Sequence, residues 1–217
     1  KPDAGGTKAK VLVAGAKKSF VEDLQTAIKN AGLIADYVVP SLIGPANAFE
    51  NAMPELFANN VIALVDIGFK TSTICLMQEG ELILSRVVNI GGDRLTSGLA
   101  EMMNISYAEA EGIKVGMAQE VESQIEMLVS PLGRELRASI DFFEHQQDRT
   151  VTRVFVSGGS ARSEYIMRTL QTELAVECSV WNPTATMHLN LPPQQNQELD
   201  QVAPQLTVAI GAALTAQ

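Results

Sequence analysis

The segment Val61–Thr73 constrains the fold of this chain most, because an apolar run ends there in a turn of small and hydroxyl residues. The run is long enough for one buried strand, and Asp66 and Gly68 stand at its end. A glycine at such a turn lets the backbone approach an anion closely, and a neighbouring carboxylate can reach a metal ion. The segment therefore predicts a strand that leads into a turn able to hold a phosphate group.

Two further strands are predicted directly after this turn. The first covers Thr73–Gln78, and the second covers Glu81–Val88. Glu79 and Gly80, which separate them, have the composition of a two-residue hairpin turn. The three strands together predict an antiparallel unit around the Asp66 turn.

The Asp66 turn has two interpretations. A strand that ends in Asp-x-Gly is more often a simple turn without a ligand. In the functional interpretation, Asp66 holds a magnesium-bound water, and the amides from Gly68 to Ser72 hold the β- and γ-phosphates of a nucleotide. The hydroxyl groups of Thr71, Ser72 and Thr73 would assist these amides. Taken alone, the turn leaves both interpretations open.

Composition limits the classes of partner. The chain has 217 residues, of which 46% are hydrophobic and 19% charged, as is ordinary for a globular protein. Its net charge of −9 and its isoelectric point near 4.7 provide no basic field to attract a nucleic acid. We therefore expect no nucleic-acid partner, whereas a nucleotide could still be held by backbone amides and one metal ion.

The sequence also gives expectations about compartment and metals. No apolar run reaches the roughly 18 residues needed to cross a bilayer, and the first residues lack a signal peptide pattern. Cys75 and Cys178 form no C-x-x-C pattern, which favours buried thiols in a reducing compartment. His145 and His188 have no partner at metal-ligand spacing. We expect a cytoplasmic protein that does not insert into the membrane directly.

The first part of the chain is predicted to alternate strands and helices. A strand is expected over Ala9–Gly15, and a helix capped by Ser19 is expected to end at Asn30–Gly32. A second strand over Leu33–Val39 and a helix over about 41–57 follow. This order predicts a β-α-β-α segment.

The remainder predicts an α/β fold with a helical insertion. Helices are expected from Asp93 to about Gln147, with a kink or break where Pro131 and Gly133 interrupt an apolar stripe. The other predicted elements are a strand over 151–156, a turn over 157–159, a helix over 160–174, a strand over 178–181, a polar loop over 192–197 and a helix over 203–216. Strands that alternate with helices are typical of α/β domains.

Three further motifs have structural interpretations, and two of them also have functional ones. The glycines of Ser157–Ser160 have two interpretations: they permit close packing only, or they let a nucleotide lie against the backbone. Gly91, Gly92 and Asp93 are explained as the start of a helix. Glu111 and Lys114 could form a solvated helix face or lie near a ribose or adenine.

Four motifs in order resemble one family. They are Asp66–Gly68 (DIG), Ser85–Thr96 (SRVVNIGGDRLT), Glu109–Lys114 (EAEGIK) and Val156–Gly159 (VSGG). Together they are similar to the PilM family of cytoplasmic type IV pilus (or type II secretion) assembly proteins, which are related to the cell-division protein FtsA in the actin-like ATPase superfamily. The resemblance extends from about Val11 to Ala213 and implies an actin-like (ribonuclease H-like) fold.

The resemblance also implies a nucleotide site, with Asp66 at a second phosphate loop, a glycine pair at the adenosine and a Glu–Lys pair near the ribose and base. Asp66 would hold Mg²⁺ through water or orient a water molecule. The implied nucleotide-binding residues are Asp66, Gly68, Phe69, Lys70, Thr71, Ser72, Gly91, Gly92, Glu111, Lys114, Gly158, Gly159 and Ser160.

The implied function is that of a scaffold. Its partners would be the cytoplasmic tail of an inner-membrane PilN-type protein and other pilus assembly proteins, which would hold it at the inner membrane. ATP with Mg²⁺ would serve as a conformational ligand, with at most weak ATPase activity in the complete protein. The alternatives are a small-molecule kinase or ATPase of the same superfamily, or an FtsA-like division protein. No catalytic acid or sugar pocket supports the former, and Gly211–Gln217 lacks the basic residues of an FtsA-type membrane helix.

The chain departs from the family pattern in two ways. Phe69 and Lys70 occupy a turn that the family often keeps small, and Gly112 stands where an acidic residue is usual. In addition, an actin-like site lies between two lobes that each give one Asp-x-Gly hairpin, and this sequence contains one. We expect a linker at 1–8, a remnant of lobe one at 9–59, and lobe two at 60–217 with a helical subdomain at about 93–149. The chain would then lack the start of lobe one and bind ATP weakly or not at all.

Overall fold

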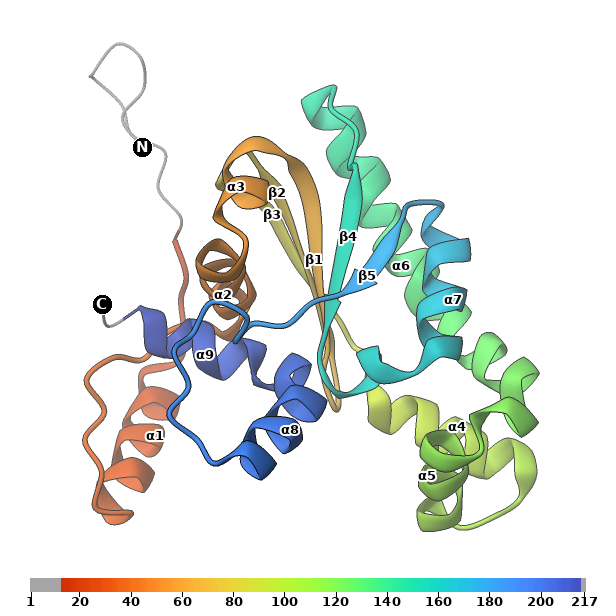
Figure 1. Cartoon of the computed structure of the whole chain (residues 1–217). Helices are drawn as coiled ribbons and strands as arrows, with labels where there is room; N and C mark the ends of the chain where they lie inside the picture. Colours follow the sequence, from red (N-terminus) through yellow and green to blue (C-terminus); the bar gives the residue numbers. More distant parts are fainter. Residues whose placement is uncertain (1–12, 216–217) are drawn as a thin grey trace. The chain divides into compact units, whose positions relative to one another are not determined.

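The structure, a computed structural model, describes residues 13–215, which form two units, 13–40 and 41–215 (Figure 1). Predictions for residues 1–12, including most of the first expected strand, lie outside the described residues. No helix between residues 13 and 215 is both long and apolar enough to cross a bilayer.

The first unit contains one helix, α1 (Lys18–Asn30), and its other described residues have no regular structure. The predicted helix is confirmed, but Ser19 lies inside it, and Lys17 at the N-cap position makes no side-chain capping bond. The strand predicted over Leu33–Val39 is wrong, and residues 13–15 are not a strand either. A strand needs a neighbouring strand for its backbone hydrogen bonds, and the sheet within 13–215 takes all its strands from the second unit.

The second unit is built on a five-stranded mixed sheet with the order β3-β2-β1-β4-β5. The hairpins that join β1, β2 and β3 are antiparallel, whereas β4 runs parallel to β1 and β5 runs parallel to β4. The strands are β1 (Val61–Ile67), β2 (Ser72–Gln78), β3 (Glu81–Val88), β4 (Arg153–Ser157) and β5 (Cys178–Val180). The predicted α/β class and the three-stranded unit are confirmed.

Helices cover both faces of this sheet (Figure 1). The α6 and α7 helices lie against one face, and α2 and α3 lie against the other. The helices are α2 (Gly44–Ala52), α3 (Pro54–Asn59), α4 (Gly92–Met103), α5 (Tyr107–Gly116), α6 (Glu122–Gln147), α7 (Glu164–Leu174), α8 (Pro193–Val202) and α9 (Thr207–Leu214).

The central strand β1 contributes to two separate hydrophobic clusters. Ala63 and Val65 point into the cluster formed with α4, α6 and α7. Ile62 and Leu64, which alternate with them, point into the cluster that contains Phe49 and the single tryptophan. Because side chains alternate across a strand, this pattern places β1 in the middle of a three-layer arrangement.

The helix predicted over 41–57 is divided into two at Met53. The chain forms a short 3₁₀ turn before α2, and α3 begins at Pro54. Met53 has a φ angle of −139°, outside the helical region. A proline disfavours the helical conformation of the residue before it, so Pro54 explains the break.

A kink or break was predicted at Pro131 and Gly133, and the break is wrong, because α6 continues through both residues. A Cβ atom at Gly133 would lie 2.6 Å from the Cβ atom of Glu173 on α7, so the two helices approach closely at this glycine. The packing of α6 against the sheet and α7 offsets the free-energy cost of the hydrogen bond that Pro131 cannot donate.

Three boundaries near the end of the chain also differ from prediction. The polar loop expected over 192–197 forms the first turns of α8, because Pro193 suits a helix start and Gln and Glu residues follow. The helix expected from Ser160 begins at Glu164, after a 3₁₀ turn, η3 (Gly159–Arg162). Likewise α9 begins at Thr207, after a 3₁₀ turn that contains Pro204.

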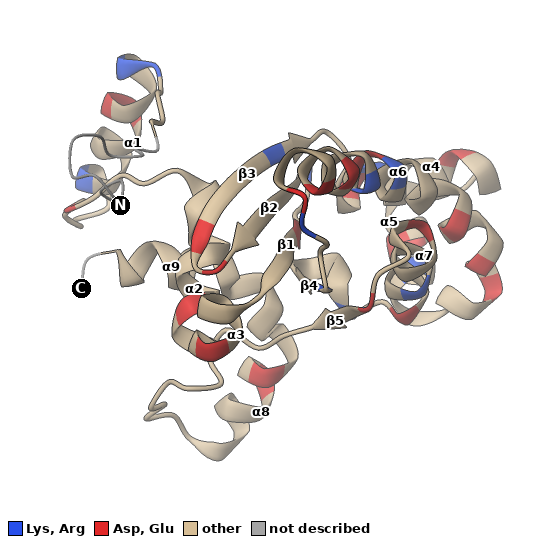
Figure 2. Cartoon of the chain, turned by 90° about the horizontal axis from the view of Figure 1, so that it is seen from above, with Lys and Arg blue, Asp and Glu red and all other residues tan. Residues whose placement is uncertain are grey.

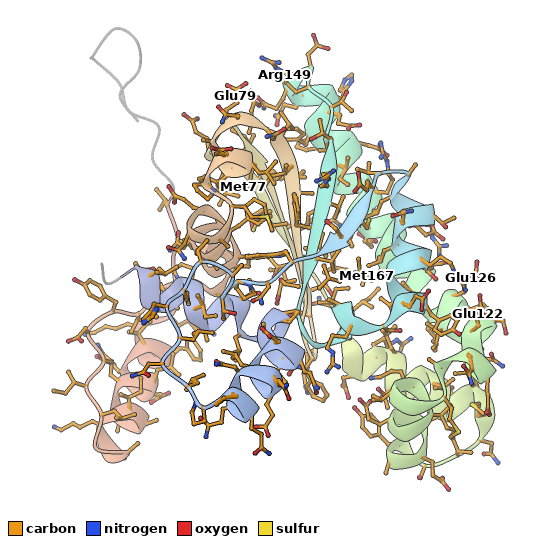
Figure 3. All side chains as sticks on the ribbon, viewed as in Figure 1. Met77, Glu79, Glu122, Glu126, Arg149 and Met167 are labelled. Atoms are coloured by element: carbon orange, nitrogen blue, oxygen red, sulfur yellow. The ribbon has the colours of Figure 1, made fainter. Side chains whose placement is uncertain are left out.

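Most charged residues of the described part of the chain lie in helices. Figure 2 shows Lys and Arg as scattered positions among more numerous Asp and Glu residues. Several ion pairs link distant parts of the chain; in one of them Arg149, just after α6, lies 3.9 Å from Glu79 in the β2–β3 turn (Figure 3). Both side chains are more than half exposed, so the pair contributes little to stability.

Candidate functional site

The turn between β1 and β2 is held against the start of α4. Within the turn, the Gly68 amide donates to the Thr71 carbonyl over 3.0 Å. The amides of Gly92 and Asp93 then donate to the carbonyls of Gly68 (2.9 Å) and Phe69 (2.8 Å). A Cβ atom at Gly91 would lie 2.6 Å from the Gly68 carbonyl oxygen, so this contact requires a glycine.

Asp66 lies beside β4. The parallel register pairs it with Ser157, whose hydroxyl donates to the Oδ1 atom of Asp66 over 2.8 Å. Burial raises the pKa of the Asp66 carboxyl, and the Ser157 hydrogen bond opposes this shift only in part. Asp66 is therefore a partly buried carboxyl group, and a nearby cation would stabilise its ionised form.

The turn after β4 passes directly against the end of β1. Gly158 has a φ angle of +93°, which favours glycine, and its amide donates to the Pro204 carbonyl over 2.8 Å. A Cβ atom at Gly158 would overlap the Ile67 carbonyl. A Cβ atom at Gly92 would lie 3.1 Å from the Ser160 hydroxyl oxygen, so the turn after β4 also reaches the start of α4.

The α5 helix brings Glu111 and Lys114 to the same place. Ser106 and Glu109 form a capping box that fixes the start of this helix. Lys114 and Glu111, three residues apart, form an ion pair with 2.7 Å between Nζ and Oε2. Burial raises the pKa of Glu111, but hydrogen bonds from Lys114 and Thr96 outweigh it and leave the pKa below its ordinary value. This carboxyl is thus ionised at neutral pH.

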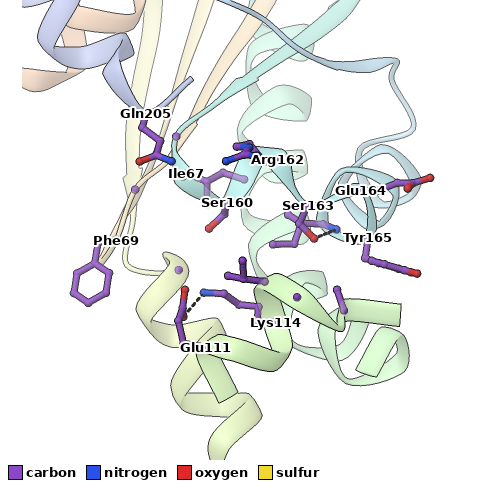
Figure 4. A pocket seen from close by; sticks show the side chains of 18 of the residues that line it. Ile67, Phe69, Glu111, Lys114, Ser160, Arg162, Ser163, Glu164, Tyr165 and Gln205 are labelled. Atoms are coloured by element: carbon purple, nitrogen blue, oxygen red, sulfur yellow. Dashed lines mark hydrogen bonds and ion pairs between the residues drawn. The ribbon is translucent and has the colours of Figure 1, made fainter. Parts of the chain in front are cut away.

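These elements enclose one cavity of about 960 Å³ (Figure 4). The predicted site residues that line it come from all four motifs. They are Asp66, Gly68, Phe69, Gly92, Glu111, Lys114, Gly158, Gly159 and Ser160. The structure thus brings together residues that are far apart in the sequence.

Four other predicted site residues do not line this cavity. Lys70 and Thr71 are exposed at the tip of the β1–β2 turn. Ser72 is buried, and its hydroxyl donates to the Ile90 carbonyl over 2.6 Å, which holds the β3–α4 connection. Gly91 lies beneath the turn. Contacts of all the predicted site residues with a nucleotide remain predictions.

Other lining residues were not identified from the sequence. Arg162 and Tyr165 follow the Gly158–Gly159 motif by a few positions, so the start of α7 could have been searched for them. Tyr107 donates from its hydroxyl to the Oδ1 atom of Asp93 over 3.0 Å. Gln205 comes from the far end of the chain, and no sequence pattern marks it.

The arrangement suits a ligand with a polyphosphate end and a polyol or base end. The glycine turns let a ligand approach the backbone, and Asp66 is placed to hold a cation through water. No cluster of three or more His, Cys, Asp or Glu side chains that could hold a metal directly exists within 13–215. On the cavity wall that α5 provides, Glu111 can accept hydrogen bonds and Lys114 can donate them.

Comparisons with known proteins identify the fold and the family. A family model described as type IV pilus assembly protein PilM matches residues 2–217. The cell division protein FtsA of Bacillus subtilis (strain 168) is 29% identical over 103 residues, which cover 48% of this chain and 22% of that protein. A solved PilM–PilN type IV pilus biogenesis complex is similar with a TM-score of 0.76 and 23% identity, over 90% of this chain and 57% of that one.

A more distant solved structure, MreB 5 of Spiroplasma citri bound to AMPPNP, is similar with a TM-score of 0.62 and 12% identity. The match covers 93% of this chain and 65% of that chain, so this chain spans less than two thirds of each of these relatives. These likenesses confirm the actin-like fold, and the family match over residues 2–217 shows that this chain belongs to the PilM family of type IV pilus assembly proteins.

Proposed function

We propose that this chain provides one side of an ATP site in a scaffold of type IV pilus assembly. The observation that carries the proposal is the convergence of the Asp66 turn, the Gly158 turn and the Glu111–Lys114 pair on one cavity. The AMPPNP in the MreB 5 structure, which has a similar fold, supports the choice of ligand.

The phosphate end of the ATP would lie at the β1–β2 turn. Asp66 would hold Mg²⁺ through water, and Gly68 and the residues after it would face the phosphates. When bound, Mg-ATP would bring a divalent cation and a triphosphate chain to this end. The cation would stabilise the ionised form of Asp66, which now has one neutral partner, Ser157.

The nucleoside end would lie between α5 and the start of α7. The ionised Glu111 carboxylate would accept hydrogen bonds from ribose hydroxyls, and Lys114 would keep it oriented. Gly158 and Gly159 would let the adenosine lie against the backbone. Arg162 and Tyr165, which also line the cavity (Figure 4), would contact the base.

We also propose that the nucleotide acts as a conformational ligand and that the chain serves as a scaffold. The partner would be the cytoplasmic tail of a PilN-type inner-membrane protein, which would hold the scaffold at the cytoplasmic face of that membrane. The support is the family membership and the PilM–PilN complex among similar structures. Residues 60–217 would correspond to lobe two of the actin-like fold, and 9–59 to the end of lobe one.

Nucleotide binding is tested by titrating the ¹⁵N-labelled 217-residue chain with Mg-ATP and following amide resonances. Because we propose that this chain provides one side of the ATP site, we expect weak binding, with a dissociation constant for Mg-ATP on the order of 1 mM. The shifted resonances should include Gly158, Gly159 and Glu111, and Asp66→Ala should weaken binding. Shifts confined to residues outside the cavity would contradict the proposal, as would sub-micromolar affinity.

The scaffold role is tested by a pull-down with the cytoplasmic tail of a PilN-type protein. The bait should retain a protein that contains this chain together with a complete first lobe, and a tail of scrambled sequence should not. Failure of the native tail to retain that protein, with and without Mg-ATP, would count against the partner.

A further inference from the structure

Thr96 makes an unusual set of contacts for a buried threonine inside a helix. It lies on the second turn of α4 and is fully buried. Its Oγ1 atom lies 3.0 Å from the Gly92 carbonyl oxygen of its own helix. It also contacts the Glu111 carboxylate and accepts a hydrogen bond of 2.7 Å from the Lys114 ammonium, both from α5.

The Thr96 hydroxyl can take part in all three contacts because it both donates and accepts hydrogen bonds. A hydroxyl group has one hydrogen and can accept through its lone pairs, whereas an ammonium group only donates. Thr96 therefore accepts from Lys114 and donates its single hydrogen either to Glu111 or to the Gly92 carbonyl. When one of these two acceptors is engaged elsewhere, the Thr96 hydroxyl can rotate and donate its hydrogen to the other acceptor.

Gly92, the alternative acceptor, belongs to the phosphate side of the cavity. Its amide donates to the Gly68 carbonyl in the β1–β2 turn over 2.9 Å. Thr96 thus bridges the Glu111–Lys114 pair and the helix start that supports this turn. Other threonines here, such as Thr169, donate only to a carbonyl four residues earlier, as is common in helices.

We propose that Thr96 is a positioning residue that fixes the Glu111–Lys114 pair for the ribose hydroxyls of the nucleotide. This inference rests on the proposed ATP site. When Glu111 engages a ribose, Thr96 transfers its hydrogen bond to Gly92 and remains satisfied. The Glu111 carboxylate is therefore oriented before the nucleotide binds. It can then leave Thr96 for the ribose without leaving the buried Thr96 hydroxyl unpaired.

The test compares Thr96→Val, which keeps the shape but removes the hydroxyl, with Thr96→Ser, which restores it. Thr169→Val is the matched control, because Thr169 is a buried helical threonine without contact to the pair. Mg-ATP and its 2′,3′-dideoxy analogue are titrated into each labelled chain. Thermal unfolding of each variant verifies that it is folded.

The unaltered chain should prefer Mg-ATP to the dideoxy analogue by about tenfold, the value of one good hydrogen bond to a charged group. Thr96→Val should reduce this preference to about twofold, with little change for the analogue, and Thr96→Ser and Thr169→Val should retain it. An unchanged preference in Thr96→Val would overturn the inference.

A second measurement needs no nucleotide. Carbon-13 NMR titration of the Glu111 carboxyl should give a higher pKa in Thr96→Val than in the unaltered chain, and Thr96→Ser should reverse the change. An unchanged Glu111 titration would show that Thr96 does not orient the pair. If the unaltered chain binds neither nucleotide, the ATP proposal fails and the ribose role fails with it, whereas the titration still decides whether Thr96 acts on Glu111.

Discussion

Ser157 donates its hydroxyl hydrogen to the Oδ1 atom of Asp66 over 2.8 Å, and this bond joins two of the motifs that first marked the site. The two residues are paired in the parallel register of β1 and β4, although 91 positions separate them in the sequence. The motif serine is buried and does not line the cavity, so it acts on Asp66 rather than on a ligand.

Ser157→Ala should destabilise the chain and reduce affinity for Mg-ATP. The variant removes a hydrogen bond to the partly buried Asp66 carboxyl, and we expect a loss of about 1–2 kcal/mol in the free energy of unfolding. Urea denaturation, followed by the fluorescence of the buried tryptophan Trp181, measures this loss. Ser179→Ala on the edge strand β5 is the control and should change stability by less than about 0.5 kcal/mol. Equal stability of the two variants would contradict the role of Ser157.

Asp66→Asn should stabilise the ligand-free chain at neutral pH. Burial raises the folded-state pKa of Asp66 above the ordinary value of 3.8, and the Ser157 bond only partly opposes it. The folded state then binds a proton more readily than the unfolded state, so Asp66 lowers stability as pH rises through the window between 3.8 and the folded-state pKa. We expect a rise in Tm of about 2–4 °C at pH 7.

The same substitution should have little effect below pH 3.8, where the carboxyl is protonated in both states. Thermal unfolding at several pH values checks this dependence. A stabilisation that persists unchanged at low pH would show that ionisation of Asp66 is not its cause.

Gly158→Ala should be much more damaging than Gly159→Ala. The first substitution places a methyl group against the Ile67 carbonyl at a residue with a φ angle of +93°. At Gly159 the nearest atoms are 3.9 Å away, in the flexible side chain of Gln205. We expect a loss of about 2–4 kcal/mol for the first and less than about 1 kcal/mol for the second, from urea denaturation. Similar losses would show that the turn after β4 relaxes away from β1.

Gly211→Ala and Gly112→Ala should change stability in opposite directions. A Cβ atom at Gly211 in α9 would overlap the Gly44 carbonyl of α2, so the two helices would have to separate. Gly112, inside α5, has no atom within 4 Å of such a Cβ atom, and alanine there favours the helix by about 0.5–1 kcal/mol. Opposite shifts in Tm are expected, and a stabilised Gly211→Ala would contradict the close crossing of α2 and α9.

Both thiols should be unreactive in the native chain at pH 7. Burial raises the pKa of Cys75 to about 11 and that of Cys178 to about 12. The reactive thiolate is therefore scarce in both residues, and Cys75 is also enclosed by the core. A thiol-specific chromogenic reagent should react slowly with the native chain and quickly after denaturation, and rapid labelling of native Cys75 would contradict its burial.

Much of the fold could be predicted from local patterns, and the errors have local causes. The β1–β2–β3 unit was predicted because apolar runs and a Glu-Gly turn are strong short-range signals. The strand predicted over Leu33–Val39 has the right composition, but composition cannot provide a neighbouring strand. Pro131 was expected to break α6, and packing against α7 and the sheet overrides that local preference.

The sequence predicted the glycine turns around the cavity, but it could not predict the contacts that depend on the tertiary structure. Gly68 and Gly158 indicate turns in the sequence, and both residues line the cavity. Ser72 looked like a phosphate ligand, yet its hydroxyl bonds the Ile90 carbonyl, a contact that depends on the β3–α4 connection. Thr96 ends the Ser85–Thr96 motif and Gln205 belongs to no motif, but the contacts of both residues come from neighbours distant in the sequence.

The position of β1 between two hydrophobic clusters has a mechanical consequence for the turn at its end. A displacement of Asp66 or Gly68 would disturb the packing of β1 against both the α6–α7 layer and the α2–α3 layer. We therefore expect the β1–β2 turn to keep its position when a ligand binds, and any conformational change to occur in the elements that close over the ligand.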